Sequence, residues 1–308
     1  MTDPKGEQGA AAGGGVPGGR RSSDPLGRPV ERFQQDGQWL EYLTSGAQDL
    51  RPLVLLQSLE YPAWPDPKFC AMAEAAGLRT ISIRRPGYGP VPALADIDRQ
   101  VDLISAFLRE QGSDSIVLAC SGTANTFGYR LAQDPQVGLT VLCNCCFNHY
   151  PMAEIRPDWF ARHMEQTLST ETGARLALMG LKGAQAIFGK YWVTENFMQK
   201  SPGDLEYLRS NKELFAEAMD CLLTGLDIHT FILELRGTLK EDTFLKDGCF
   251  EELPVISISG METSETWQNS VRAEAERVGV PLHFVPSGDA LVLYQSAGEF
   301  IDLVRKCA

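Results

Sequence analysis

The chain has 308 residues, of which 44% are hydrophobic and 22% are charged, and its net charge is -12. These proportions are typical of a globular protein and exclude a disordered chain, a collagen and a coiled-coil rod. The excess of acidic over basic residues, 40 against 28, disfavours binding to nucleic acid or to an anionic membrane surface. No apolar run reaches the roughly 18 residues that a membrane span needs, and the N-terminus has no hydrophobic signal core. We therefore expect a cytoplasmic protein with no nucleic-acid or membrane partner.

Eight cysteines are spread along the chain, and several of them lie inside apolar runs. This distribution is typical of reduced, buried thiols and not of a disulfide framework. Cys143, Cys145 and Cys146 lie close together, but no second pair of ligands with a usable spacing accompanies them. We interpret these three residues as part of a buried strand, and we expect neither a metal site nor a cofactor.

Residues 1–30 are rich in Gly, Pro, Ser and Arg, so they bury too little apolar surface to offset the entropy of ordering. Beyond them, short apolar segments that are typical of buried strands alternate with segments of helical periodicity. The expected strands cover residues 37–46, 53–56, 80–83, 116–119, 139–143, 254–260 and 282–285. The expected helices cover residues 68–76, 96–112, 129–132, 264–279 and 297–306. This alternation predicts an α/β fold with a parallel sheet that helices cover on both faces.

Residues 151–245 interrupt the alternation, because they show helical periodicity and no clear strand. We therefore predict a flexible tail over 1–30, an α/β core formed by 31–150 and 246–308, and a helical cap formed by 151–245. We expect six of the aromatic residues in the cap mainly to pack between its helices, with a minority facing a ligand cavity. They are Trp159, Phe160, Phe188, Tyr191, Trp192 and Phe197.

The order of the elements and three local segments resemble one known superfamily. The sequence RPGYG (85–89) follows the second buried strand. Residues 115–144 have the order strand, tight turn, helix and strand, and residues 253–262 (LPVISISGME) form a late strand followed by an acidic residue. Together they resemble the α/β-hydrolase superfamily over residues 33–308. The resemblance implies the α/β-hydrolase fold, which is a mainly parallel sheet with helices on both faces and, here, a helical cap insertion.

Hydrolases of this superfamily carry their nucleophile on a sharp turn between a strand and a helix, flanked by small residues and activated by a histidine and an acid. The corresponding turn here is ACSGTAN (119–125), and it admits two registers. Counting back from the helix puts the nucleophile position on Gly122, which leaves no nucleophile. Counting forward from the strand puts it on Ser121, flanked by Ala119 and Thr123. A structural role for Ser121 is a hydrogen bond that caps the helix.

The resemblance places the catalytic histidine in the loop after the last strand, where this chain has Ala290. No histidine follows His283, which alternates with apolar neighbours and is therefore expected to lie on a sheet face. His149 follows the strand 139–143 at its carboxyl end, so it is the remaining candidate base, with a structural hydrogen bond as its alternative role. Without a base, a serine hydroxyl stays protonated and is a weak nucleophile.

The position of the catalytic acid is also altered. Thr263 stands where the superfamily commonly has an aspartate, with Glu262 one position before it and Glu265 two positions after it. Either glutamate has the chemistry to orient a base. A glutamate at the start of a helix is equally explained by its favourable interaction with the positive end of the helix dipole.

The loop that forms the oxyanion hole in the superfamily differs as well. Gln57 and Ser58 stand where histidine and glycine are common. The Gln57 side chain and a backbone amide near Leu59 are the groups that remain to donate hydrogen bonds to an oxyanion. The turn, the base, the acid and this loop all depart from the pattern together, and this combination indicates loss or replacement of hydrolytic chemistry.

We therefore predict an α/β-hydrolase-fold protein that lacks a Ser-His-Asp triad, is non-hydrolytic, and binds a small apolar ligand or a partner. The expected ligand-binding residues are Gln57, Ser58, Leu59, Ser121, Gly122, Thr123 and Ala290. The alternative is a divergent, esterase-like serine hydrolase that acts on a small ester or acyl substrate through Ser121, with His149 as its base. A third hypothesis, a partner-binding scaffold, needs no cavity and predicts a filled interface between cap and sheet. The sequence leaves the oligomeric state open.

Overall fold

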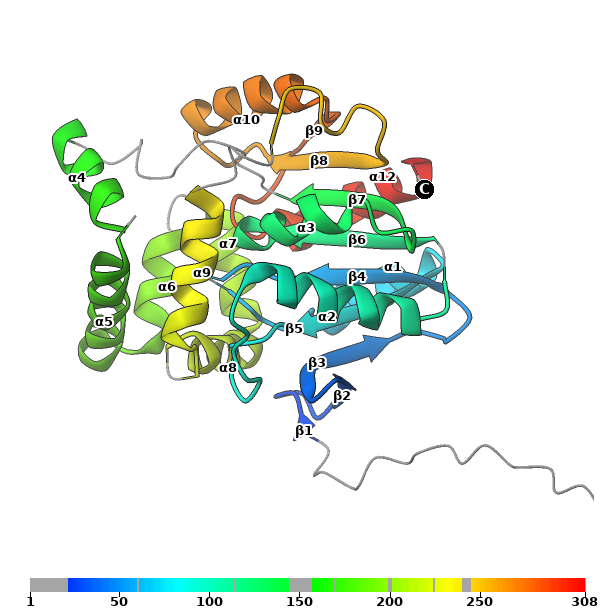
Figure 1. Cartoon of the computed structure of the whole chain (residues 1–308), viewed down its shortest axis with the longest axis horizontal. Helices are drawn as coiled ribbons and strands as arrows, with labels where there is room; N and C mark the ends of the chain where they lie inside the picture. The colour runs from blue at the N-terminus through cyan, green and yellow to red at the C-terminus, as the bar shows by residue number, and fades with distance from the viewer. Residues whose placement is uncertain are drawn as a thin grey trace, which may run out of the picture.

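A computed structural model describes residues 22–59, 61–113, 115–143, 157–168, 170–198, 201–223, 225–239 and 245–307. Within these residues, nine strands form one sheet in the order β1-β2-β3-β5-β4-β6-β7-β8-β9 (Figure 1). The strands are β1 (Ser22–Ser23), β2 (Pro29–Gln35), β3 (Gln38–Ser45), β4 (Arg51–Leu56), β5 (Leu78–Arg84), β6 (Ile116–Ser121), β7 (Val137–Cys143), β8 (Val255–Gly260) and β9 (Leu282–Val285). The first three strands run antiparallel to their neighbours, and β4 to β9 pair in parallel.

The parallel sheet that the alternation predicts is confirmed. Every residue of β5, β6 and β8 is buried, because strands covered on both faces must be apolar throughout or satisfy their polar groups internally. The predicted strands differ from the observed ones by a few residues at their ends. β2 was not predicted from the sequence, because most of its residues are exposed and its apolar residues do not alternate clearly.

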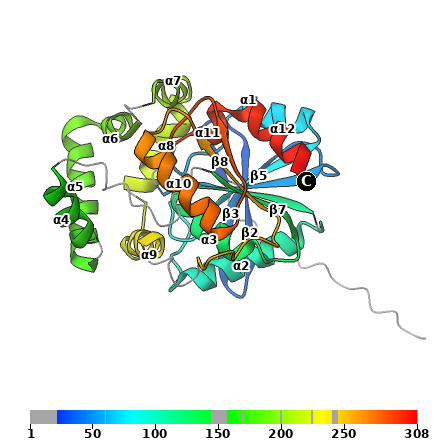
Figure 2. The same ribbon diagram turned by 90° about the horizontal axis from the view of Figure 1, so that it is seen from above.

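Helices cover both faces of the sheet (Figure 2). Phe69 of α1 (Pro67–Ala75) and Phe300 of α12 (Ala297–Cys307) pack on one face. Phe107 of α2 (Ile97–Glu110) and Phe127 of α3 (Asn125–Leu131) pack on the other. Two further helices complete these layers, α10 (Glu265–Val278) and the short α11 (Val292–Gln295). The core is therefore divided by the sheet into two apolar layers, as in other α/β proteins.

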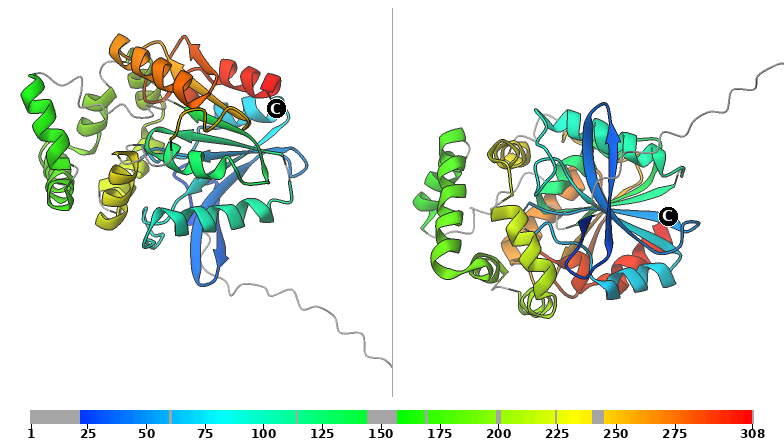
Figure 3. Two further views of the ribbon diagram at one scale, coloured as in Figure 1. Left: turned by 45° about the horizontal axis from the view of Figure 1, so that its top comes forward. Right: turned by 90° about the horizontal axis from the view of Figure 1, so that it is seen from below.

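A block of helices lies at the carboxyl ends of the parallel strands (Figures 1 and 3). Its members are α4 (Asp158–Leu168), α5 (Glu171–Phe188), α6 (Lys190–Met198), α7 (Pro202–Ser210), α8 (Lys212–Leu223) and α9 (Ile228–Leu239). We refer to these helices as the cap. Side-chain oxygens of Thr170 and Ser201 accept hydrogen bonds from the first turns of α5 and α7, which is why these helices begin there. No helix in the described part of the chain is long and apolar enough to span a membrane.

The prediction for the cap aromatics is wrong for three of them. Trp159, Phe188 and Trp192 are largely exposed, although the rings of Phe188 and Trp192 stack on each other. Tyr191 is half-buried, and its hydroxyl donates to the backbone carbonyl of Lys212. The side chains of Phe160 and Phe197 lie outside the described residues. Periodicity identifies a helix and an apolar stripe, but it does not tell which helix has a partner to cover that stripe.

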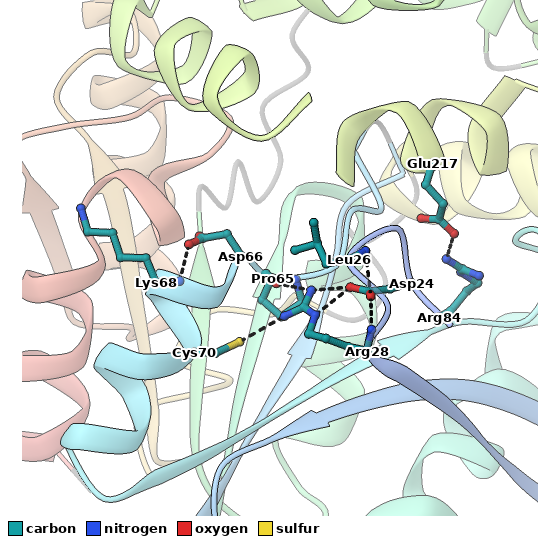
Figure 4. A network of polar contacts seen from close by, with 9 residues as sticks. All are labelled: Asp24, Leu26, Arg28, Pro65, Asp66, Lys68, Cys70, Arg84 and Glu217. Carbon is teal, nitrogen blue, oxygen red and sulfur yellow. Dashed lines mark hydrogen bonds and ion pairs between the residues drawn. The ribbon is translucent and has the colours of Figure 1, made fainter. Parts of the chain in front are cut away.

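The ordered chain begins before the boundary expected from composition. Residues 22–30 were expected to belong to the flexible tail, yet Asp24 and Val30 are buried and β1 pairs with β2. The Asp24 carboxylate accepts hydrogen bonds from the backbone and the guanidinium of Arg28 (Figure 4). The same guanidinium donates to the carbonyl of Pro65 at 2.8 Å. Polar contacts of Asp24 and Arg28 attach this segment to the core. The prediction of a flexible tail, which relied on low apolar content, is therefore wrong for residues 22–30.

Candidate functional site

The turn between β6 and α3 is the point where the superfamily pattern places the nucleophile. β6 ends at Ser121, a 3-10 turn covers Gly122–Ala124, and α3 follows. Gly122 has a φ of 53°, in the left-handed region, whereas Ser121 is extended with φ -117° and ψ 137°. The strained backbone conformation that an exposed nucleophile adopts on such a turn therefore belongs to Gly122.

Ser121 is a strand residue with buried surroundings. It is 3% exposed and stands opposite Cys143 in the pairing of β6 with β7. Burial raises the pKa of the Cys143 thiol to about 12, and a hydrogen bond from Ser121 acts weakly against this rise. The hydroxyl of Ser121 is thus engaged with a neutral thiol on the sheet.

The space beside Gly122 is already filled. A Cβ atom built on Gly122 would lie 2.9 Å from Cβ of Ser58 and closer still to its hydroxyl, and 3.5 Å from the Tyr61 hydroxyl. Real Cβ atoms do not approach other heavy atoms to under about 3 Å, because interiors are already close-packed. Ser58, which replaces the glycine common in the oxyanion loop, therefore occupies the place that a nucleophilic side chain would need.

The oxyanion loop donates its hydrogen bonds within the protein. The backbone N–H of Leu59 donates to Oγ1 of Thr123 at 2.8 Å, and Nε2 of Gln57 donates to the hydroxyl of Tyr294. Tyr294 stacks on Tyr207 of α7, with ring centroids 5.3 Å apart. Both groups considered as oxyanion donors therefore have partners within the protein, Leu59 in the turn and Gln57 on α11.

A buried ion pair connects the cap to the turn. Glu234 of α9 is 0% exposed, and its carboxylate accepts hydrogen bonds from both terminal nitrogens of Arg85 and from Oγ1 of Thr123 at 3.2 Å. Arg85 also donates to the carbonyl of Gln57 at 2.9 Å. Burial by itself lowers the pKa of Arg85, but the adjacent Glu234 carboxylate raises it overall, so the guanidinium keeps its charge.

The loop that would carry the catalytic histidine is held by a second cap carboxylate. Oδ2 of Asp204, on α7, accepts hydrogen bonds from the backbone N–H groups of Asp289, Ala290 and Leu291 at 3.2, 2.7 and 3.2 Å. The base position is occupied by Ala290, which is buried and carries no imidazole. His283 lies on β9 opposite Ile258, as expected for a sheet residue. His149 lies outside the described residues, and its role stays a prediction.

The region expected to hold the acid also contacts the cap. The carboxylate of Glu262 accepts a hydrogen bond from Oγ of Ser201, the residue that caps α7. Thr263 is buried and presents a hydroxyl and not a carboxylate. Glu265 is exposed in the first turn of α10, where it interacts favourably with the helix dipole.

Six of the residues expected to bind a ligand are buried, and among these only Gln57 lines the small cavity beside Arg85. Gln57, Ser58, Leu59, Ser121, Thr123 and Ala290 are each at most 8% exposed. The cavity that adjoins Gln57 and Arg85 has a volume of about 10 Å³. Such a space accommodates about one water molecule, whereas pockets for small ligands measure ~300 Å³ or more. No group of three metal-ligating side chains occurs among the described residues.

The sequence analysis missed the two carboxylates that organise this site. Asp204 and Glu234 were part of an amphipathic helical pattern and carried no motif. One signal was available in the sequence FILELRG, where Glu234 stands within a strongly apolar stretch. An acidic residue on the apolar side of a helix indicates a buried partner, because an unpaired buried charge is very costly.

The stability of the protein is expected to fall as the pH rises from about 4 to about 7 through Asp204. Burial raises the pKa of this carboxyl from 3.8 to about 7, and it outweighs the three backbone hydrogen bonds, which favour the ionised form. Between these pH values the folded chain holds a proton that the unfolded chain has released, so raising the pH favours unfolding. The Asp204→Asn variant removes this titration. We expect its free energy of unfolding, measured relative to that of wild type, to increase by about 2–4 kcal/mol as the pH rises from 4 to 8.

Urea unfolding of both proteins across this pH range measures the effect. Leu208→Ala, also on α7 and buried, is the matched control because it destabilises without removing a titratable group. Its loss relative to wild type is expected to be the same at every pH. A pH-independent difference between Asp204→Asn and wild type would mean that Asp204 ionises normally.

Comparison with known proteins supports the architecture. The sequence matches no family model and no curated protein. Solved structures do match it over 90% of the chain. They include an enol-lactonase from Burkholderia xenovorans (13% identity, 99% of that chain covered, TM-score 0.59). A Cif epoxide hydrolase from Acinetobacter nosocomialis (14%, 88%, 0.63) and an epoxide hydrolase from Vigna radiata (13%, 96%, 0.61) are similar to the same extent.

These identities are too low to carry an activity, but the shared topology extends over nearly the whole of each chain. The expectation drawn from the sequence resemblance is thereby confirmed for the fold. The chain has the α/β-hydrolase fold.

Proposed function

We propose that this protein is a non-hydrolytic member of its fold class and acts by binding a partner through its outer surface. The observation that carries the proposal is the turn after β6, where the left-handed position is Gly122 and Ser58 fills the adjoining space. An acyl-transfer enzyme needs a nucleophile at that point and free donors beside it. At this point the chain has a glycine instead of a nucleophile, and two of the expected donors, the Gln57 side chain and the Leu59 N–H, already have partners.

The contacts between cap and core support the same conclusion. Each position that the superfamily uses for catalysis is joined to a cap side chain: the turn to Glu234, the base loop to Asp204 and the acid loop to Ser201. Substrate entry under a cap requires that cap and core separate or leave a channel. Buried ion pairs and hydrogen bonds favour one fixed arrangement instead.

Binding of a partner is supported better than binding of a small ligand beneath the cap. The cavity beside Gln57 and Arg85, about 10 Å³, is too small for a ligand, and Gln57 is the one expected ligand-binding residue that lines it. A filled interface between cap and sheet is what the scaffold hypothesis predicts. The outer surface of the cap, by contrast, exposes large apolar side chains.

A fluorophosphonate probe tests the proposal, because such probes label serines that an enzyme has activated. The purified full-length protein is incubated with the probe and its intact mass is measured, with an active serine hydrolase in a parallel reaction. We expect no adduct, since Ser121 is buried on the sheet and hydrogen-bonded to Cys143. Circular dichroism of the same sample establishes that the protein is folded.

Two variants make the result specific. Ser121→Ala removes the candidate nucleophile, and Ser82→Ala removes a serine that is equally buried in β5. A stoichiometric adduct that is lost in Ser121→Ala and kept in Ser82→Ala would establish the alternative, a divergent esterase-like hydrolase. An adduct that survives both substitutions would identify another activated nucleophile and would contradict the proposal just as directly.

A further inference from the structure

Large apolar side chains are exposed on three consecutive cap helices, α4, α5 and α6, at the end of the molecule far from the sheet (Figures 1 and 3). Their exposed fractions lie between 41% and 76%. They are Trp159, Leu176, Met179, Ile187, Phe188 and Trp192. In the rest of the described chain, only Leu26 and Met261 are large, apolar and comparably exposed. The exposed apolar surface is thus concentrated on the cap.

One face of α5 carries most of this surface. Leu176, Met179, Gly180, Gly183 and Ile187 recur at helical spacing and are all exposed, and we call them the α5 face. The opposite face of the helix packs inward through Ala174 and Leu178. Every exposed residue of α5 from Leu176 onward is uncharged, in a chain with a net charge of -12.

The centre of the α5 face is flat. A Cβ built on Gly180 or on Gly183 would meet no atom within 4 Å, so the glycines are not required by packing inside the chain. Glycine in the middle of a helix costs about 0.5–1 kcal/mol relative to alanine. Glycines at such a position allow the backbone of a second helix to approach closely.

The apolar surface reaches the upper end of what a monomer exposes and about three quarters of what each partner of a standard interface buries. With a full accessible area of about 200 Å² for each large side chain, Leu176, Met179, Ile187, Phe188 and Trp192 expose roughly 600 Å² of apolar surface. Phe188 and Trp192 stack with ring centroids 4.7 Å apart, which extends the face beyond the end of α5. Standard protein interfaces bury about 800 Å² on each partner, and the largest apolar patch of a typical monomer is about 300–600 Å².

We propose that the α5 face binds the same face of a second copy of this chain. Met179 and Ile187 stand four residues on either side of Gly183, so an antiparallel crossing at Gly183 places Met179 of each copy against Ile187 of the other. A two-fold axis at this point makes the surface its own complement. The charge of the chain disfavours an anionic membrane as the occupant, while an uncharged face allows two acidic molecules to meet.

This inference does not rest on the proposed function, because an active hydrolase with the same α5 face would dimerise in the same way. Its test is the oligomeric state, measured by sedimentation velocity on the full-length chain between about 1 and about 100 µM. We expect wild type to sediment as a dimer. Met179→Glu places an unpaired carboxylate in the interface and is expected to weaken dimerisation by at least about 100-fold.

Met261→Glu is the matched control. Met261 is 60% exposed, close to the 67% of Met179, but it lies on the loop after β8 and away from the cap helices. The same change of side chain at this position is expected to leave the dimer intact. A wild type that stays monomeric at the highest concentration, or a dimer that both variants weaken equally, would overturn the proposal.

A crosslink tests the position of the two-fold axis. In a background of Cys307→Ser, which removes the one thiol classed as exposed among the described residues, Gly183→Cys brings the two introduced thiols together at the axis. Gly298→Cys on α12, where a side chain also meets nothing within 4 Å, is the control. Oxidation is expected to link the chains through Gly183→Cys and not through Gly298→Cys. Binding of a monomer to neutral lipid vesicles would assign the α5 face to a membrane surface and contradict self-association.

Discussion

Glu234→Ala is expected to lower the free energy of unfolding by about 3–5 kcal/mol, because it leaves the buried guanidinium of Arg85 without its carboxylate. Arg85 is 3% exposed, and its side chain lies over the rings of Tyr88 and Phe127, so bulk water does not solvate the unpaired guanidinium. The substitution also removes the acceptor of the Thr123 hydroxyl. Urea unfolding at neutral pH measures the loss.

Glu217→Ala is the matched control, since Glu217 of α8 forms a second ion pair between the cap and the core. Its partner is Arg84 of β5 (Figure 4), but the Glu217 side chain is 26% exposed and Arg84 retains Glu41 at 3.0 Å. We expect this variant to lose only about 1 kcal/mol. Equal losses in the two variants would mean that Arg85 finds water or another acceptor.

A double variant separates the charge from the shape of this site. Arg85→Met combined with Glu234→Leu replaces the pair by apolar side chains of similar length and leaves no buried charge. It is expected to recover most of the stability lost in Glu234→Ala, as buried pairs replaced by apolar residues commonly do. If the double variant is as unstable as the single one, the hydrogen bonds to Gln57 and Thr123 stabilise the site and the ion pair does not.

Gly122→Ser, which places a serine on the turn where the superfamily has its nucleophile, is expected to destabilise the protein by about 2–4 kcal/mol and to create no activated serine. The positive φ costs about 1–2 kcal/mol for a residue with a Cβ, and overpacking against Ser58 adds about 1–3 kcal/mol. Thermal and urea unfolding measure the stability, and the fluorophosphonate probe measures the reactivity.

Two further variants divide this loss into its causes. Gly112 has a similar φ of 65° but open space around it, so Gly112→Ser is expected to show the backbone cost alone. Ser58→Gly combined with Gly122→Ser removes the clash and is expected to restore about 1–3 kcal/mol of the loss. If Gly122→Ser is no less stable than Gly112→Ser, Ser58 moves aside freely and the turn is not filled.

The Arg85–Glu234 pair and the turn at Gly122 differ from a hydrolase active site in the same way. In a hydrolase the turn, the base loop and the acid loop face a substrate, whereas here each of them faces a polar side chain of the cap. Arg85 comes from the RPGYG motif that supports the resemblance, and the chain uses it to hold Glu234. The motif was identified from the sequence and the loss of the triad was predicted from it, but the cap residues that contact these positions were not identified.

The sequence by itself determined the parallel sheet, the helices on both faces, the helical cap and the location of the turn at residues 119–125. These features depend on the local periodicity of apolar residues and on short motifs, which a single chain displays directly. The absence of a histidine at Ala290 and of an aspartate at Thr263 was equally visible. The expectation that the six cap aromatics pack inside was wrong for three of them, because exposure depends on neighbouring helices.

Only the tertiary structure decided between the two registers of the turn. Ser121 and Gly122 are adjacent, and the choice depends on where the backbone leaves the strand and adopts a positive φ, which the pairing of β6 with β7 sets. The roles of Asp204 and Glu234 were hidden for a related reason. Each carboxylate finds its partners more than 80 residues away in the chain, so no local pattern marks it, and only the packing of the cap on the sheet brings the donors to it.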